Sequence, residues 1–581
     1  LGGYYLNYTE TPVKAYEIFK KEPESHVFNQ LTATHWRFKE AVDNMTEYLV
    51  LEGEYEYGID LLQEVVEGMR ANEHTVQTEL GDMMVSLAQM QTHAGDYKIA
   101  EQNTDEALKL IRRDGERKSE EFVNALNSAA LIYGPMGIYN KAERLLNRSN
   151  SIARKLEGGD KEARLKSIED LAFLYTRIGN YSETEYLLKE VIDERKEIYG
   201  ADSRKLIKPH NAIGELHVIR GEYPDGEKNI RRSLDICEMV YGENSLIYAK
   251  NLMALVDFYL EIGDYQSGLL QLDKVFKTRT QKLRQNHILF SDVFTKYGLL
   301  HYHLGSDLSK VESYFQRARQ IVQATFDENH PSYAEAIKNL AFLYVQRGEY
   351  DRALPLLEQA DEIWSDALGN KNKSSGEVAR LKGDIYTYQG QHKLAQDEYD
   401  KAAKYFRKIF SKQHPDYLNS LSKLAQAHYI NDDLSKVESL LSETTEEYLA
   451  YTREYFPTLS EEEKAKFWTK IKKDFEFYNT VAADFRYDKP KYLENMYDFA
   501  LATKSLLLNS SIKTRNAILN SGDTTLISLF EDWLEQKEFL TSTLSRSDEE
   551  LVEDGININD IKEDIALLEK ELSARSTAFA Q

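Results

Sequence analysis

A glycine turn that recurs at a nearly constant interval is the feature that most constrains how this chain can fold. Clear copies have the form Gly-x-Tyr, as in Gly53-Glu54-Tyr55 and Gly348-Glu349-Tyr350. Further copies begin at Gly95, Gly137, Gly179, Gly221, Gly263, Gly305 and Gly390, and a degenerate tenth copy is Asn431-Asp432-Asp433. The step is 42 residues, apart from one step of 43 and a last step of 41. Ten turns in one register predict an array of similar repeats.

The residues on either side of each turn predict two helices per repeat. Before Gly348, Leu340, Ala341 and Tyr344 recur at helical spacing, and Tyr350, Ala353, Leu357 and Ala360 do so after it. Glycine suits the turn because it adopts a positive φ angle without a clash of its side chain. Each repeat is therefore predicted to be a helix, a short turn and a second helix.

Two further positions predict how these helices pack. A small residue seven positions before the turn would let the two helices of a repeat approach closely, and another small residue five positions after it would do the same for the second helix. A ring four positions before the turn would fill the gap between repeats. The small residues seven positions before the turn are Ala88, Ala130, Ala172, Gly214, Gly298, Ala341 and Gly383. The small residues five positions after the turn are Gly58, Ala100, Ala142, Gly226, Gly268, Ala353 and Ala395. The rings four positions before the turn are Tyr133, Tyr175, Tyr259, Tyr344 and Tyr386.

This pattern resembles the tetratricopeptide repeat over roughly residues 35–445. The period is longer than the usual 34 residues. The extra length lies between repeats, as in residues 327–333, and is similar to that of kinesin light chains. The resemblance implies an all-α, right-handed solenoid of about ten helix-turn-helix repeats. Such stacks form an extended concave surface, which we expect the first helices to line.

The repeat register ends near Thr445, and helical patterns continue to the end of the chain. Ser460-Glu461-Glu462-Glu463 has the form of a capping box that starts a helix. Two later patterns, one through Leu526, Phe530 and Trp533 and one through Ile558, Ile565 and Leu572, predict an antiparallel hairpin. We therefore divide the chain into an N-terminal helical segment (1–34), the repeat array (35–445), a helical linker (446–521) and a hairpin arm (522–581).

A second resemblance covers the linker. Residues 494–511, followed by Ile518-Leu519-Asn520-Ser521-Gly522-Asp523, look like the segment that joins a tetratricopeptide array to a CHAT domain, the caspase-like peptidase domain of bacterial repeat proteins. The stretch from Tyr448 to Trp468 is also similar to that family. The catalytic His and Cys of the family have no matching positions here. Because the chain does not begin with Met and stops abruptly at Gln581, we expect a fragment or a processed product.

Composition and motifs argue against several classes of function. The net charge of −24 argues against a protein that binds nucleic-acid phosphates. A single cysteine, Cys237, excludes an internal disulfide framework and a cysteine-based zinc site. Phosphate-loop, dinucleotide-binding, zinc-protease and EF-hand motifs are absent, so we predict no cofactor, no metal and no catalytic residue. We interpret Cys237, the pair His301 and His303, and the recurring His330-Pro331 and His414-Pro415 as structural.

The sequence shows no signal peptide and no apolar run of the roughly 18 residues that a membrane span needs. We therefore expect a soluble protein that is not inserted in a membrane. Low cysteine content fits both the cytoplasm and the bacterial periplasm, and we favour the cytoplasm. The oligomeric state stays open.

Polar residues of the predicted groove are the candidates for binding. An asparagine amide both donates and accepts hydrogen bonds, so it could hold the backbone of an extended peptide, and arginine could hold an acidic side chain or a terminal carboxylate. The alternative is that these are ordinary solvated helix residues. The candidate peptide-binding residues are Asn127, Asn211, Asn251 and Asn339 on first helices and Arg177, Arg220 and Arg347 beside the turns.

We interpret the chain as a scaffold that binds a protein or peptide partner in the groove, and as the regulatory part of a CHAT peptidase whose catalytic domain is absent. Partner binding would change the pitch of the superhelix and reposition the hairpin. One alternative is a stand-alone adaptor or structural subunit of a larger assembly. The other is an unrecognised enzyme, which would need convergent titratable groups that no motif shows.

Overall fold

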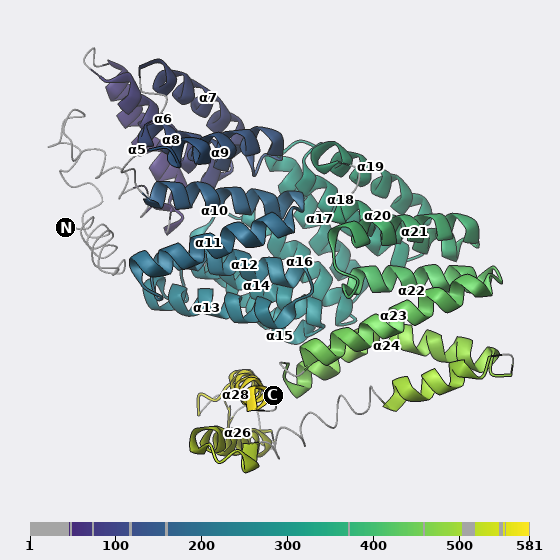
Figure 1. The fold of residues 1–581 in the computed structure, drawn as a ribbon. Coiled ribbons are helices and arrows are strands. Elements are labelled where there is room, and N and C mark those ends of the chain that lie inside the picture. Colours follow the sequence, from purple (N-terminus) through teal and green to yellow (C-terminus); the bar gives the residue numbers. More distant parts are fainter. Residues whose placement is uncertain are drawn as a thin grey trace. The chain divides into compact units, whose positions relative to one another are not determined.

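The computed structural model describes residues 46, 49–50, 52–71, 75–114, 119–156, 161–369, 372–456, 459–487, 489–501, 518–544, 546, 550–551 and 554–579. Helices account for nearly all regular structure in these residues, and none of them forms a β-strand (Figure 1). The expected N-terminal segment 1–34 and most of the CHAT-like run after Leu501 lie outside the described residues.

Paired helices follow the repeat register. The first helices are α6 (Gln77–Ala94), α8 (Glu120–Tyr133), α10 (Lys161–Ile178), α12 (Ile207–Ile219), α14 (Leu246–Ile262), α16 (Leu289–His303), α18 (Pro331–Gln346), α20 (Lys373–Tyr388) and α22 (Pro415–Ile430). The second helices are α5 (Tyr55–Ala71), α7 (Tyr97–Asp114), α9 (Tyr139–Ala153), α11 (Tyr181–Tyr199), α13 (Tyr223–Tyr241), α15 (Tyr265–Lys282), α17 (Leu308–Thr325), α19 (Tyr350–Leu368), α21 (His392–Ile409) and α23 (Leu434–Tyr455). The helix-turn-helix prediction is therefore confirmed.

A residue in the left-handed backbone conformation ends the first helix of each pair. The nine turn glycines, from Gly53 to Gly390, have φ angles between 72° and 92°. In the tenth turn the left-handed residue is Asp432, with a φ of 57°. Aspartate tolerates this region better than most residues because its short polar side chain can bond locally. The prediction that placed this turn at Asn431 with a step of 41 is therefore wrong, since Asp432 keeps the step at 42.

The small residues seven positions before the turn allow the predicted close approach. Ala88, Ala172 and Ala341 are completely buried. A Cβ atom on Gly214 would lie 2.6 Å from Ile230 Cγ1 and 2.9 Å from the Ile230 backbone nitrogen. No real side chain fits that space, so glycine is required there by the facing helix and not by its φ angle.

The described residues form two compact units. The first contains those within 1–219, 226–257 and 269–381, and the second contains those within 220–225, 258–268 and 382–581. This division does not coincide with the boundaries that we drew from the sequence, which stay a prediction. Each compact unit is described separately below.

Within the first compact unit, turns contact loops that lie far along the chain. His287 and His330 each stand just before a first helix and accept a hydrogen bond at Nδ1 from a backbone N–H of that helix, at 3.2 and 3.0 Å. Their Nε2–H groups donate to the carbonyls of His93 and Pro135, both at 2.7 Å. These acceptors lie more than 190 residues earlier, beside the turn glycines. Each imidazole therefore caps one helix and fastens it to an earlier turn.

The second compact unit contains the last repeats and the extension. His414 caps α22 by accepting a hydrogen bond from the Asp416 N–H at 3.1 Å, and its ring stacks on Phe410. These contacts, with those of His330, confirm that the recurring His-Pro pairs are structural. The predicted capping box is present, because Ser460 and Glu463 exchange both hydrogen bonds at the start of α24 (Glu461–Asp484).

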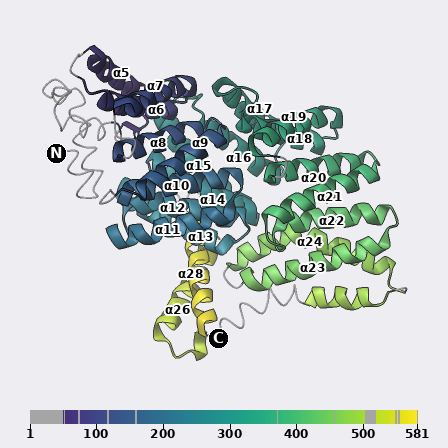
Figure 2. The same ribbon diagram turned by 45° about the horizontal axis from the view of Figure 1, so that its top comes forward.

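The C-terminal hairpin is formed by α26 (Thr524–Thr543) and α28 (Ile558–Phe579), which lie side by side in Figures 1 and 2. Leu526, Phe530 and Leu572 form its core, and the Trp533 indole donates to Glu569 at 3.1 Å. Lys570 of α28 also pairs with Glu463 of α24 at 2.6 Å. The predicted hairpin is therefore confirmed, and it is tied to the linker by an ion pair.

Replacing His330 with Asn separates its two roles. Asn can still cap α18, as Asn372 caps α20 by accepting from the Ser375 N–H, but it cannot reach the Pro135 carbonyl. We expect a loss of about 1–3 kcal/mol of unfolding free energy at pH 8, from the lost hydrogen bond and the lost ring stacking on Phe326. Urea unfolding followed by circular dichroism measures this loss.

The size of this loss should depend on pH. Burial, more than any other influence, lowers the pKa of His330 to about 4, so the unfolded chain binds a proton more readily than the folded chain. The wild type therefore loses stability between about pH 6.5 and pH 4, whereas Asn does not titrate. We expect the difference between the two proteins to shrink by about 1–2 kcal/mol at pH 5. An unchanged difference would contradict the neutral, Nε2-protonated state of this imidazole.

Candidate functional site

One position on the first helices carries a charged residue in six successive repeats. This position lies thirteen residues before the turn glycine. Its occupants, which we call the charged row, are Lys166, Lys208, Lys250, Asp292, Glu335 and Glu377. Three cations are thus followed by three acids along adjacent first helices of the first compact unit.

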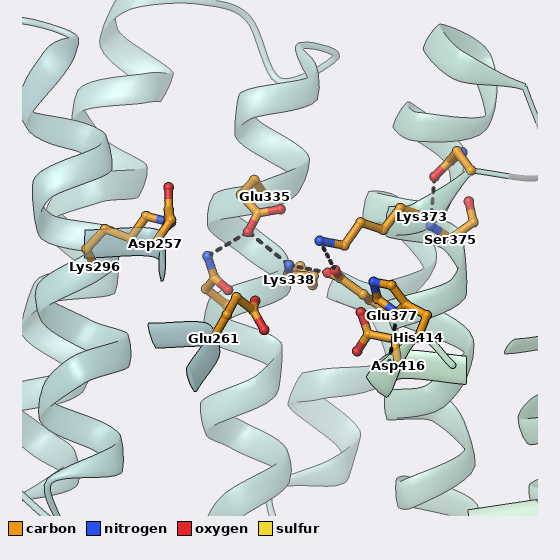
Figure 3. A network of polar contacts seen from close by, with 12 residues as sticks. Asp257, Glu261, Lys296, Glu335, Lys338, Lys373, Ser375, Glu377, His414 and Asp416 are labelled. Atoms are coloured by element: carbon orange, nitrogen blue, oxygen red, sulfur yellow. Dashed lines mark hydrogen bonds and ion pairs between the residues drawn. The ribbon is translucent and has the colours of Figure 1, made fainter. Parts of the chain in front are cut away.

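Two of the three acids of the charged row, Glu335 and Glu377, are paired with neighbouring lysines, as Figure 3 shows. Lys338 pairs with Glu335 at 2.9 Å and with Glu377 at 2.7 Å, and its side chain is only 11% exposed. Burial opposes the charge on Lys338, but the two carboxylates outweigh it and raise the pKa of Lys338 above its usual value. The Lys373 ammonium lies 3.8 Å from Glu377. Glu335 and Glu377 therefore belong to one ion-pair network.

The basic half is not neutralised in this way. Lys208 and Lys250 are exposed to solvent, and neither forms an ion pair with any residue that the structure describes. Burial and the nearby cations, of which Lys208 has the largest effect, lower the pKa of Lys250 to about 8, although Glu215 raises it. Three cations and one acid, Glu215, act on Lys250, so positive charge prevails around it.

Two acids on the same helices, Asp170 and Glu215, neutralise these lysines only in part at neutral pH. Burial raises the pKa of Asp170 on α10 to about 7, and burial likewise raises that of Glu215 on α12 to about 7. Asp170 is only 6% exposed, and its Oδ2 atom has no hydrogen-bond partner among the described residues. At pH 7 each carboxyl is therefore charged only part of the time.

The four asparagines predicted to bind a peptide are almost fully buried, with exposed fractions of 0% to 6%. Asn127 accepts a hydrogen bond from the Ser149 hydroxyl at 2.6 Å and has no surface of its own. Asn251 donates to the Ile247 carbonyl at 2.9 Å within α14. Asn211 and Asn339 donate to Glu215 and Glu335 at 2.6 and 3.3 Å. Asn211 and Asn339 therefore lie beneath the charged surface. Contact of these four asparagines with a ligand stays a prediction.

The three predicted arginines have different surroundings. Arg177 is exposed, and its charge acts on Glu215 and Lys250, so the structure places it beside the basic half of the row. Arg347 is held by Glu312 of α17. Arg220, in the second compact unit, pairs with Glu222 at 2.8 Å. Of the seven predicted residues, Arg177 is the one both exposed and close to the unneutralised lysines.

Cys237 and His301 are built into the packing, whereas His303 is exposed. Cys237 is completely buried, and burial raises the pKa of its thiol to about 12, so it is not poised to act as a nucleophile. His301 stacks on Tyr314 with ring centroids 5.4 Å apart. Within the described residues, no group of three or more His, Cys, Asp or Glu side chains could hold a metal ion. Nor is any described helix long and apolar enough to span a bilayer.

Comparison with known families supports the repeat assignment. A model of the tetratricopeptide repeat matches residues 292–365 and 375–447, and a second model of this repeat matches residues 164–204. The chain therefore contains tetratricopeptide repeats, and the helix pairs described above have the corresponding all-helical solenoid fold. No curated protein matches the chain.

Several solved structures are similar over part of the chain. A kinesin light chain-like protein of Podosopora anserina with nearly identical TPR-like repeats is 21% identical, with a TM-score of 0.28, over 35% of this chain and 96% of its own. A Rap protein complexed with Competence and Sporulation Factor is 14% identical, with a TM-score of 0.42, over 64% and 99%. The quorum sensor NprR from B. thuringiensis is 12% identical, with a TM-score of 0.38, over 61% and 93%.

The surroundings of Lys250 give a direct test of the site. Because Lys208 lowers the pKa of Lys250, Lys208→Gln should raise that pKa from about 8 toward its usual value. Titration of isotopically dimethylated lysines, followed by NMR, reports each lysine separately. Lys228→Gln, on an exposed position of the second helix α13, serves as the matched control and should leave Lys250 unchanged. A value near 10 for Lys250 in the wild type would contradict the crowded, unneutralised site.

Proposed function

We propose that this chain is an interaction scaffold whose first helices bind an extended segment of a protein partner along the charged row. Stacked helical repeats create extended concave surfaces that suit such ligands. The observation that carries the proposal is the basic half of the row, in which Lys208 and Lys250 are exposed and have no ion-pair partner among the described residues. Keeping like charges crowded costs stability, so this arrangement favours a role in binding over a role in folding.

The polar residues around the row have complementary tasks in this proposal. Arg177 adds a planar guanidinium that can hold a carboxylate through two parallel hydrogen bonds. Asn211 and Asn339 orient the carboxyl groups of Glu215 and Glu335, and so act on a ligand through those carboxyl groups. We propose no catalytic task for these residues.

A peptide selected by display on the purified chain tests the proposed surface. Lys250→Trp replaces a cation of the row with a bulky ring, and Lys228→Trp places the same ring on the second helix α13. We expect Lys250→Trp to weaken the selected peptide by at least about tenfold, which corresponds to roughly 1.4 kcal/mol, and Lys228→Trp to have no effect. Fluorescence anisotropy measures both affinities. Peptides that bind the two variants equally well would place the binding surface elsewhere.

We further propose that the scaffold is the regulatory part of a CHAT peptidase. The similarity of residues 494–511 and 518–523 to the segment that precedes such domains supports this. The ion pair between Lys570 and Glu463 offers a physical link from the linker to the hairpin, through which partner binding would reposition the arm. The alternative is a stand-alone adaptor, in which the same surface joins subunits of an assembly.

The gene itself distinguishes these two roles. A reading frame that continues beyond Gln581 with a caspase-like His and Cys would favour the peptidase. In that longer protein, the selected peptide should change peptidase turnover, and Lys250→Trp should abolish the change without lowering basal turnover. A stop codon directly after Gln581 would contradict the peptidase role and leave the adaptor.

A further inference from the structure

The three lysines of the charged row occur at successive steps of 42 residues, so Lys166, Lys208 and Lys250 occupy the same position on α10, α12 and α14. We infer that this lysine row binds an acidic segment in extended conformation, with its carboxylates at every third residue. The inference rests on the proposed function and names the chemistry of the partner. None of the three lysines forms an ion pair with a residue that the structure describes.

The spacing follows from the packing of helices. Helices in contact have axes roughly 8–10 Å apart, so equivalent side chains on successive first helices are separated by about that distance. An extended chain of the polyproline II type advances about 3.1 Å per residue with three residues per turn, so residues three apart lie on the same side of the chain, about 9 Å apart. Carboxylates at positions i, i+3 and i+6 would each meet one lysine, whereas the carboxylates of adjacent residues point in different directions.

The repeat register places the three lysines at one position of successive first helices, and their charges act on the same neighbouring groups. Lys208 lowers the pKa of Lys250, and Lys166 and Lys208 both act on the carboxyl of Asp170 between them. Arg177 is a fourth cation whose charge acts on Lys250. In a chain with a net charge of −24, this local excess of positive charge is opposite to the overall charge. Binding an anionic segment would relieve the repulsion among the four groups.

The acidic half of the row limits the ligand. Asp292 follows Lys250 at the same position of the next first helix, and Glu335 and Glu377 follow in turn. A long polyanion such as a nucleic acid would meet no further unpaired cation beyond the third lysine, because Asp292 follows and Lys338 is already paired with Glu335 and Glu377. A short acidic run that ends in uncharged residues matches this limit, so a peptide segment fits better than a nucleic acid.

Synthetic peptides with equal charge test the spacing. A neutral host of Ser, Gly and Ala carries three Glu residues either at every third position or side by side. We expect the peptide with spaced Glu residues to bind at least about tenfold more tightly than the peptide with adjacent Glu residues. The spaced peptide in which Gln replaces each Glu should not bind. Equal affinity of the spaced and clustered peptides would overturn the inference. Tighter binding of an oligothymidylate than of the spaced peptide would also overturn it.

A reversal of charge locates the contact. Lys208→Glu should weaken binding of the spaced peptide by at least about tenfold. Replacing the central Glu of that peptide with Lys should restore most of its affinity for this variant. Lys228→Glu is the matched control on the second helix and should leave both affinities unchanged. Restored affinity also shows that the variant is folded. Failure of the restoration, with unfolding midpoints equal to those of the wild type, would contradict the assigned contact.

These outcomes distinguish this inference from the proposed function. If display-selected peptides are blocked by Lys250→Trp but spaced acidic peptides do not bind, the surface is correct and the acidic ligand is wrong. If no bound peptide responds to Lys250→Trp, both the proposed surface and the inference fail.

Discussion

The constraint on which the rest of the structure depends is a left-handed backbone residue that recurs every 42 residues. Because each turn ends one helix and starts the next at the same point, equivalent residues of successive repeats occupy equivalent positions on neighbouring helices. The small residues seven positions before the turn act within this register, since Gly214 leaves space that the facing Ile230 occupies. A regular register of this kind converts a pattern along the sequence into rows of side chains across the helices.

Most of the fold could be predicted from the sequence, because periodic turns and helical spacing are local signals. The tenth turn was misplaced by one residue, since sequence type suggested Asn431 whereas the backbone uses Asp432. The contacts of His287 and His330 with His93 and Pro135 were not predictable. They depend on the curvature of the stacked repeats, which the period does not determine.

The candidate site was predicted less well, because residue type was given more weight than register. Asn127 and Asn211 lie ten residues before their turns, Asn251 twelve and Asn339 nine, so they do not form one row. The lysine row was present in the printed sequence at steps of 42 residues. What the sequence could not show is which charges are neutralised: Lys338 pairs with Glu335 and Glu377, whereas Lys250 has no such partner among the described residues.

The central claim is that the register of the turns aligns the lysine positions into one surface that a single extended segment crosses. Site-specific photocrosslinking measures this directly, with a photoreactive residue placed in turn at positions 166, 208 and 250 and, as a control, at position 228. The account predicts crosslinks from the three row positions to residues of one bound peptide that are three apart and in order. Crosslinks from position 228 alone, or from the three row positions to the same peptide residue, would contradict it.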